Sequence, residues 1–238
     1  MEIFNKLPEK LSALISEMEQ YETLANEELI RFLPTYQFKA ENFWHLADFD
    51  HSPKYSYGRT KIYQGGNFAI FLMSWSPNDF TAIHNHGQSD WGAVCFLGEV
   101  NHRLYQLENQ SILLADKAII PAGTVVPVTG NLVHAMGNLS KQSSLSLHIY
   151  GSNQTMEKPD ITTRIYELEK KRVRITSGEA FIGGDESYGE PSNDLSTNVE
   201  TLIDYLKILL PFYEKNGNRT ITSYIKSVIQ DPSLYFAQ

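Results

Sequence analysis

Two histidines one residue apart, His84 and His86, are the clearest candidates for chemistry in this chain of 238 residues. On a β-strand a spacing of two sends both side chains to the same face, whereas on a helix they would diverge by more than half a turn. Strand-forming residues flank the pair in TAIHNHGQSDWGAVCFLGEV. The spacing therefore predicts two imidazoles that converge on one point, and neutral imidazole is the commonest metal ligand.

A third histidine follows at a suggestive place. Pro121–Gly123 precede the stretch LVHAMGN, in which His134 and Asn138 form H-x-x-x-N. This arrangement resembles that of cupin barrels, which pair H-x-H with a later histidine on an adjacent strand. The glutamate that typical cupins add after H-x-H is replaced here by Asp90 or Trp91. Three neutral imidazoles without a carboxylate would leave a divalent metal with its full charge, which favours a thiolate as a further ligand.

Further motifs resemble cysteine dioxygenase, the thiol dioxygenase branch of the cupins. The resemblance covers roughly residues 55–153 and keeps the family's order of motifs. They are Tyr57-Gly58-Arg59 for Y-x-R, His84, His86 and the strand-ending Gly98 for H-x-H, His134 with Asn138 for H-x-x-x-N, and Ser146-Leu147-His148-Ile149-Tyr150 for S-x-H-x-Y.

The resemblance implies a role for each of these side chains. It implies an Fe(II) centre with the ligands His84, His86 and His134. Arg59 would clamp the substrate carboxylate, to which its planar fork is suited, with support from Tyr57. Tyr150 would place its hydroxyl over the open metal positions. Ser146 and His148 share its strand face, which permits a hydrogen-bond chain that fixes the tyrosine.

One departure from the family concerns a covalent link. Animal members join a cysteine to the active-site tyrosine through a thioether, and the matching position here is Trp91 or, shifted by one, Gly92. Cys95 lies further along the chain and is expected to pack as a small buried hydrophobe. The chain therefore resembles the bacterial type that has no crosslink.

The reaction implied is the oxidation of L-cysteine by O2 to cysteine sulfinic acid. Two alternatives stay open. One is a dioxygenase for another small thiol such as 3-mercaptopropionate, a branch that typically lacks the arginine, so that Arg59 favours cysteine. The other is a noncatalytic cupin that binds a metal or a small ligand.

The candidate site residues lie between residues 55 and 175. In this region short segments rich in strand-forming residues must hold them in place. Runs such as FAIFLMSW, WGAVCFL and SLSLHIY follow at close spacing and predict an antiparallel sandwich or barrel. The predicted fold class is mainly β, a cupin (small β-barrel or jelly-roll) core with N-terminal helices and a C-terminal helical extension. Amphipathic spacing predicts a helix over 8–21, and a second begins with Asn26 as its N-cap and stops before Pro34.

In the C-terminal third the sequence pattern changes from strands to a loop and then to helices. SGEAFIGGDESYGEPSND predicts a loop, and two helical patterns follow it. Thr197 opens a capping box with Glu200, Pro211 ends the first helix, and the second spans 222–230. The predicted division is a cupin thiol dioxygenase domain with the N-terminal helices over residues 1–176, a linker over 177–192 and a helical extension without metal ligands over 193–238.

Composition sets broader limits. A net charge of −8 argues against a nucleic-acid-binding face. The single cysteine suits a reducing compartment and excludes an internal disulfide framework. No signal peptide and no long apolar run stand out, so we expect a cytoplasmic monomer or homodimer without nucleic-acid or membrane partners.

The remaining candidates have ordinary interpretations. His45, His51 and His102 have no matching partners in the sequence and are expected to be surface or half-buried residues. The basic stretch from Lys170 to Arg174 is opposed by acidic neighbours, which predicts a solvated face.

Overall fold

A computed structural model of the chain describes residues 7–21, 23–87, 89–153, 163–184, 187–190, 192–193 and 195–237. The helices are α1 (Glu9–Met18), α2 (Asn26–Phe32), α3 (Val199–Lys215), α4 (Arg219–Gln230) and α5 (Ser233–Phe236), with short 3₁₀ turns at Leu33–Tyr36, Ala40–Asn42, Trp44–Leu46 and Leu168–Lys170. The strands are β1 (Gly58–Gln64), β2 (Phe68–Trp75), β3 (Ile83–His84), β4 (Trp91–Phe96), β5 (Val100–Glu108), β6 (Ser111–Ile120), β7 (Val125–Pro127), β8 (Val133–Gly137), β9 (Ser144–Gly151), β10 (Thr163–Glu167), β11 (Arg172–Thr176) and β12 (Ser196–Thr197).

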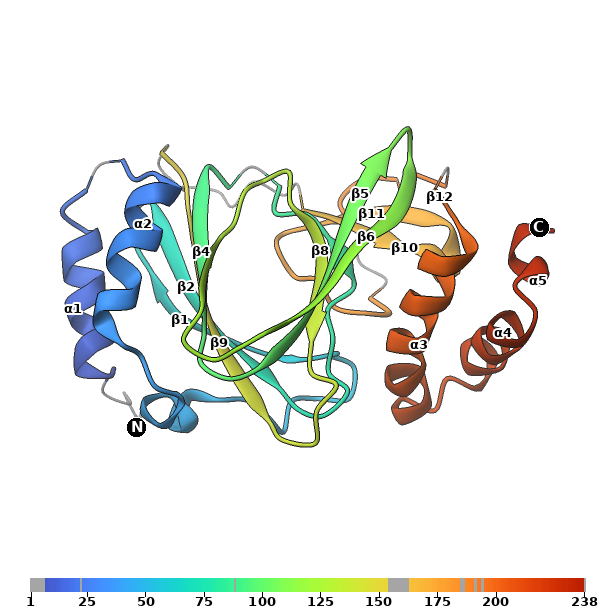
Figure 1. Ribbon diagram of the computed structural model, residues 1–238, viewed down its shortest axis with the longest axis horizontal. Helices are drawn as coiled ribbons and strands as arrows, with labels where there is room; N and C mark the ends of the chain where they lie inside the picture. Colours follow the sequence, from blue (N-terminus) through green and yellow to red (C-terminus); the bar gives the residue numbers. More distant parts are fainter. Residues whose placement is uncertain are drawn as a thin grey trace.

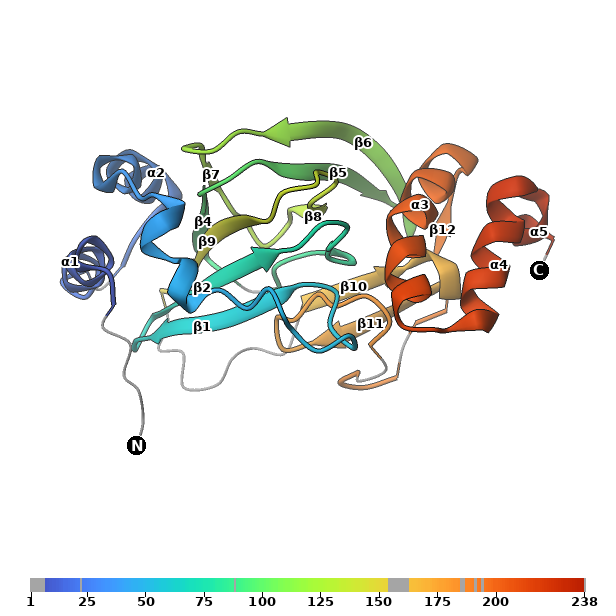
Figure 2. The same cartoon turned by 90° about the horizontal axis from the view of Figure 1, so that it is seen from below.

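The strands form two curved sheets around the centre of the molecule. One has the order β1-β2-β9-β4-β7 and the other β11-β10-β3-β8-β5-β6-β12. Figures 1 and 2 show α1 and α2 at one end of the molecule and α3 to α5 at the opposite end. The predicted fold class is therefore confirmed: mainly β, with a cupin-type barrel core, N-terminal helices and a C-terminal helical extension.

Strands β2 and β9 are buried on both faces, which explains their nearly continuous apolar sequences. Alternate residues of β2 face opposite sides: Phe68, Ile70 and Leu72 join the core beneath the N-terminal helices, and Ala69, Phe71, Met73 and Trp75 line the interior of the barrel. The same alternation in β9 sends Leu147 and Ile149 outward. Its polar residues at 146, 148 and 150 are thereby left for the interior.

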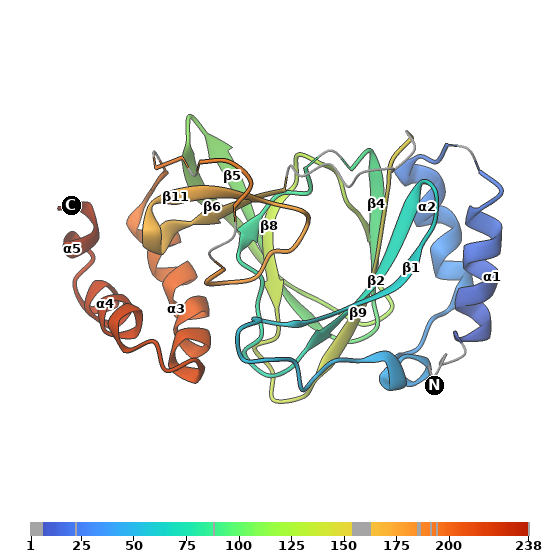
Figure 3. The same ribbon diagram turned by 180° about the vertical axis from the view of Figure 1, so that it is seen from behind.

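The N-terminal helices cover the outer face of the five-stranded sheet, as Figure 3 also shows from behind. The predicted α1 is confirmed, with Leu11, Leu14 and Met18 fully buried. The predicted cap of α2 is wrong, because Ala25 is the N-cap residue. Asn26 instead accepts a hydrogen bond from the Gly92 N–H at 2.8 Å and so ties the helix to β4.

The C-terminal helices pack on the seven-stranded sheet and share one hydrophobic core with it. Two of their predicted boundaries are wrong. Asn198, rather than Thr197, caps α3 by accepting from the Thr201 N–H at 2.8 Å. Pro211 lies inside α3 instead of ending it. A proline inside a helix costs about 3 kcal/mol, and burial of neighbouring side chains such as Leu209 and Phe212, about 1.5–3 kcal/mol each, offsets this cost.

The helices in the described residues do not combine the length and apolar character that a membrane crossing requires.

Helix α4 starts at Arg219, earlier than predicted, with Asn218 as its cap. The segment predicted as a linker has a buried portion, because Ala180 and Ile182 belong to the core shared with the C-terminal helices. The division of the chain at residues 176 and 193 stays a prediction.

The solvated face predicted for the basic stretch is wrong. The side chain of Glu167 is 1% exposed and pairs with Arg172 Nε at 2.6 Å, Lys170 Nζ at 3.2 Å and Arg174 Nε at 3.4 Å. Glu169 accepts a hydrogen bond from the Tyr213 hydroxyl of α3 at 2.9 Å. The β10–β11 hairpin therefore carries a buried charge cluster under the C-terminal helices, a long-range contact that local charge patterns do not reveal.

Candidate metal centre

The structure brings His84, His86 and His134 together. Their candidate ligand atoms all lie within 4.8 Å of one another. His84 ends β3 and stands directly opposite His134 on β8. His86 lies beyond the end of β3, so the shared strand face predicted from the spacing of two is wrong, although the imidazoles converge as expected.

The geometry of these nitrogens fits a single metal ion. The Nε2 atoms of His86 and His134 are 2.9 Å apart. Two imidazole nitrogens at about 2.1 Å from one ion and at right angles to each other would be about 3.0 Å apart. The Nδ1 atom of His84 lies 3.0 Å from the carbonyl oxygen of Ala82, to which it can donate only as Nδ1–H. The Nε2 atom of His84 is then unprotonated and available as a ligand.

The three imidazoles are neutral at pH 7. Burial lowers the pKa of His84 to about 4. Burial also lowers the pKa of His86 and of His134 well below the ordinary value, and the neighbouring histidines add to both shifts. Metal binding requires the unprotonated ring, so the site needs no proton release at pH 7 to accept a cation.

His102 is a functional candidate that the sequence interpretation missed. Its Nε2 lies 2.8 Å from Nδ1 of His134. It is on β5, two residues from Leu104, which stands opposite His134, so His102 reaches that ring diagonally on the same face. Only the pairing of β5 with β8 shows this contact, and no local spacing signals it. His51 is also buried and pairs with Asp79 at 2.9 Å, whereas His45 is exposed as expected.

No carboxylate belongs to the cluster among the described residues. Asp90, one candidate for the missing glutamate, is exposed and accepts hydrogen bonds from Ser152 Oγ and the Asn153 N–H, both at 2.8 Å. The other candidate, Trp91, is buried, and its indole N–H donates to Asn153. The candidate ligand set is therefore three neutral imidazoles, which would suit an ion that takes a further anionic ligand.

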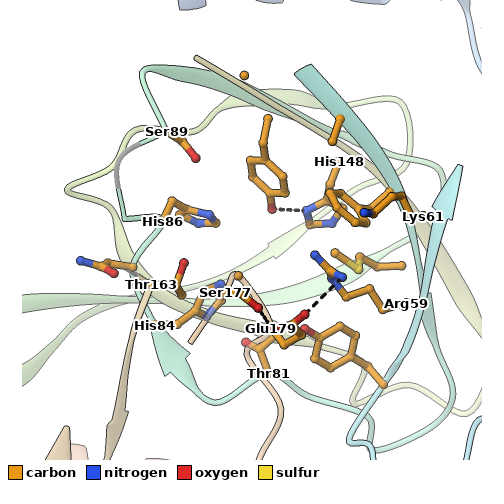
Figure 4. Close-up of a pocket in the computed structure, with 18 of the residues that line it drawn as sticks. Arg59, Lys61, Thr81, His84, His86, Ser89, His148, Thr163, Ser177 and Glu179 are labelled. Atoms are coloured by element: carbon orange, nitrogen blue, oxygen red, sulfur yellow. Dashed lines mark hydrogen bonds and ion pairs between the residues drawn. The ribbon is translucent and has the colours of Figure 1, made fainter. Parts of the chain in front are cut away.

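A cavity of about 520 Å³ lies beside the histidines, and its wall includes Arg59 and Tyr57. Figure 4 shows His84 and His86 across the pocket from Arg59. The guanidinium carbon of Arg59 lies 3.9 Å from the centre of the Phe71 ring. Its Nε–H has no hydrogen-bond partner within the described chain, so the group retains capacity for an anion. The Tyr57 hydroxyl accepts from the Ala180 N–H at 3.2 Å, which leaves its own proton available to donate.

A chain of hydrogen bonds runs along the interior face of β9. Trp75 Nε1 donates to Ser146 Oγ at 2.9 Å, Ser146 Oγ lies 2.8 Å from His148 Nε2, and His148 Nδ1 lies 2.7 Å from the Tyr150 hydroxyl. Indole is only a donor, so the serine proton can go to His148 Nε2. The Nδ1–H of His148 then donates to the Tyr150 oxygen, and the hydroxyl proton of Tyr150 is left to face the cavity.

Electrostatics keep both partners of the last hydrogen bond in this chain uncharged. Burial lowers the pKa of His148 to about 3, and the neighbouring His84 and Arg59 contribute to this shift, so the ring is neutral at pH 7. Burial raises the pKa of Tyr150 above its usual value, so the phenol keeps its proton. The cavity therefore contains a neutral hydrogen-bond donor beside the imidazole cluster.

The structure distinguishes the two positions considered for the crosslink. Gly92 stands opposite Tyr150 in the pairing of β4 with β9. A Cβ atom at Gly92 would lie 3.2 Å from the Tyr150 ring, and 2.7 Å from the carbonyl oxygen of Ile149. Trp91 and Cys95 belong instead to the core beneath the N-terminal helices. Glycine at this position leaves the Tyr150 ring without a covalent partner there.

Comparison with known proteins shows which proteins this chain resembles. A family model described as cysteine dioxygenase type I matches residues 4–156. Similar solved structures include a protein from Thermus thermophilus, with 19% identity, a TM-score of 0.37, and coverage of 45% of this chain and 90% of that one. The Schizosaccharomyces pombe Cnp3 cupin domain has 10% identity and a TM-score of 0.35, covering 41% and 65%. A cupin-like protein from Thermotoga maritima has 16% identity and a TM-score of 0.31, covering 40% and 68%.

Proposed function

The chain belongs to the cysteine dioxygenase type I family, and on this premise we propose that it is an iron-dependent thiol dioxygenase that oxidises L-cysteine. The reaction adds both atoms of O2 to the sulfur, RSH + O2 giving RSO2H, cysteine sulfinic acid. The observation that carries the proposal is a cluster of three neutral imidazoles, of which His84 and His86 line a cavity that also contains Arg59.

In this proposal Arg59 binds the substrate carboxylate. Its guanidinium group is held over the Phe71 ring, and its side chain is 16% exposed, so it faces the cavity from a fixed and partly desolvated position. A charge-assisted contact in such a place is stronger than one on the surface. A thiol with a carboxylate would therefore be oriented with its sulfur toward the histidines across the pocket.

The histidines His84, His86 and His134 would hold the ferrous ion through their Nε2 atoms. A bound ferrous ion would supply positive charge that favours the thiolate form of the substrate, together with open positions for sulfur and O2. The protein groups do the positioning. Tyr150, held by His148 and Ser146, directs its hydroxyl proton into the cavity, where it can donate a hydrogen bond to the substrate or to oxygen.

Oxygen uptake by the iron-loaded protein with a panel of thiols tests this proposal. L-Cysteine should consume one O2 per thiol and yield the sulfinate, identified by mass spectrometry. The His86→Ala variant should lose both iron and oxygen uptake. Faster turnover of 3-mercaptopropionate than of cysteine would assign the protein to the other substrate class. Iron binding without thiol-dependent oxygen uptake would instead identify a noncatalytic cupin.

A further inference from the structure

His86 differs from the other two candidate ligands in how its ring is held. Nδ1 of His84 lies 3.0 Å from a backbone carbonyl oxygen, and Nδ1 of His134 lies 2.8 Å from His102 Nε2. Among the described residues, Nδ1 of His86 has no hydrogen-bond partner, and its ring centre lies 5.3 Å from that of Tyr150. The position of the His86 ring therefore depends mainly on the backbone that carries it.

That backbone leaves the sheet at the residue before His86. His84 stands opposite Ile165 of β10, and the Asn85 N–H still donates to the carbonyl oxygen of Arg164 at 3.1 Å. In a regular antiparallel ladder the Arg164 N–H would donate back to the main-chain carbonyl of Asn85. It donates instead to the side-chain Oδ1 of Asn85, at 2.8 Å. The asparagine side chain thus replaces its own carbonyl in the ladder, which allows the chain to turn here.

The same oxygen also contacts the turn that follows His86. The Gly87 N–H lies 3.4 Å from Asn85 Oδ1, the arrangement of an Asx turn, and Gly87 has φ +58. In a straight strand the Cα atoms of His84 and His86 would lie about 6.6 Å apart with parallel side chains. The turn instead allows the candidate ligand atoms of the cluster to lie within 4.8 Å of one another.

Asn85 has hollow space on two sides. It borders the cavity of the metal centre and also a second hollow of about 480 Å³, whose wall includes Arg164. Figure 4 shows Thr163, the first residue of β10, on the same side of the pocket as His86. Packing therefore gives the turn limited support, and its hydrogen bonds to β10 set its position. Strand β10 lies beyond residue 156, where the family match ends.

We propose that Asn85 is a positioning residue for the metal centre, which keeps His86 in the ligand set by binding the main chain of β10. The inference rests on the metal site of the proposed function and is independent of the thiol reaction. Both contacts of the Asn85 Oδ1 atom are made to main-chain N–H donors. The role therefore requires an acceptor oxygen at this position.

The affinity for Co²⁺, measured by competition with a chromogenic chelator, tests the proposal without turnover. Asn85→Leu keeps the size of the side chain and removes the acceptor, so the affinity should fall by roughly 10- to 100-fold, as for other groups that support metal ligands. Asn85→Asp keeps an acceptor oxygen and should bind at least as tightly as the parent. Asn131→Leu should leave the affinity unchanged; it is the matched control, because Asn131 is an exposed asparagine on the wall of the same second hollow.

A double-mutant cycle with His86→Ala separates positioning from general support of the fold. Asn85 acts through His86 in this proposal, so Asn85→Leu should lower the affinity in the parent background and have little effect in the His86→Ala background. Equal losses in both backgrounds would overturn the inference, as would a tenfold loss in Asn85→Asp. Asn85→Ala takes the place of Asn85→Leu in the cycle if the leucine variant does not fold.

The outcomes also separate this inference from the proposed function. A parent whose Co²⁺ affinity depends on Asn85, but whose iron-loaded form consumes no O2 with thiols, would refute the proposed function and leave the inference standing. A parent that oxidises cysteine while Asn85→Leu keeps the full affinity would do the reverse. A parent that does not bind Co²⁺ would contradict the metal site and with it both proposals.

Discussion

Replacing His102 tests whether the histidine cluster is built to hold a metal. His134 is 2% exposed, and its Nδ1 has His102 Nε2 as its partner at 2.8 Å. Burial lowers the pKa of His102, so its ring is neutral and can accept the Nδ1–H of His134. With His102 as the acceptor, this hydrogen bond fixes the tautomer in which Nε2 of His134 is available as a ligand.

The His102→Ala variant leaves a buried donor without a partner, at a cost of about 1–3 kcal/mol. If the cost falls on the metal-bound state, affinity should drop by roughly 10- to 100-fold, the range typical of such supporting residues. Competition between the protein and a chromogenic chelator for Co²⁺, an air-stable substitute for ferrous iron, measures the change directly.

Two further variants make the result interpretable. His102→Gln supplies an amide oxygen that can accept the same hydrogen bond, so it should recover part of the affinity. His45→Ala removes an exposed histidine and should leave the affinity unchanged. Parental Co²⁺ affinity in His102→Ala would refute the reasoning, because the hydrogen bond would then have no influence on the ligand.

Three other predictions concern the pocket and the stability of the fold. Arg59→Ala should lower cysteine turnover by a factor of tens or more, since losing such a contact costs about 2–5 kcal/mol. It should leave the iron content and the turnover of cysteamine, which has no carboxylate, nearly unchanged; equal cysteine kinetics at equal iron loading would place the clamp elsewhere. Tyr150→Phe should keep the iron and lower turnover on the order of a hundredfold, and full activity in steady-state assays would remove the hydroxyl from the mechanism. Burial, with Glu167 nearby, raises the pKa of Glu169 to about 7 from 4.5 in the unfolded chain, so the folded state binds more protons and loses stability as the pH rises between these values. Thermal unfolding should show Glu169→Gln more stable than the parent at pH 8, with the difference shrinking toward pH 5; a constant difference would contradict this assignment.

Much of the candidate site was accessible from the sequence. The histidines of H-x-H and H-x-x-x-N and the S-x-H-x-Y motif identify residues that do meet in space, because the order of these motifs along the chain resembles that of a known family. Fold class was predictable for the same reason, because alternating and continuous apolar runs reflect faces that are buried. A cytoplasmic location and a monomeric or homodimeric state remain predictions from composition alone.

Other features depended on contacts between segments far apart in the chain. His102 supports His134 because β5 pairs with β8, and Glu179 enters the pocket because its segment is fixed to Tyr57. Glu167 is buried because the C-terminal helices cover its hairpin.

The sequence by itself determined which motifs are candidates for chemistry and which stretches have strand or helix periodicity, because both properties are local. Tertiary structure alone decided the helix caps, the continuation of α3 through Pro211 and the charge of Glu179 beside Arg59. Each of these depends on which distant groups satisfy a hydrogen bond, cover an apolar face or face a charge. Such long-range partners are fixed only when the sheets close around the core, so local propensity gives way wherever burial contributes more free energy than the local preference.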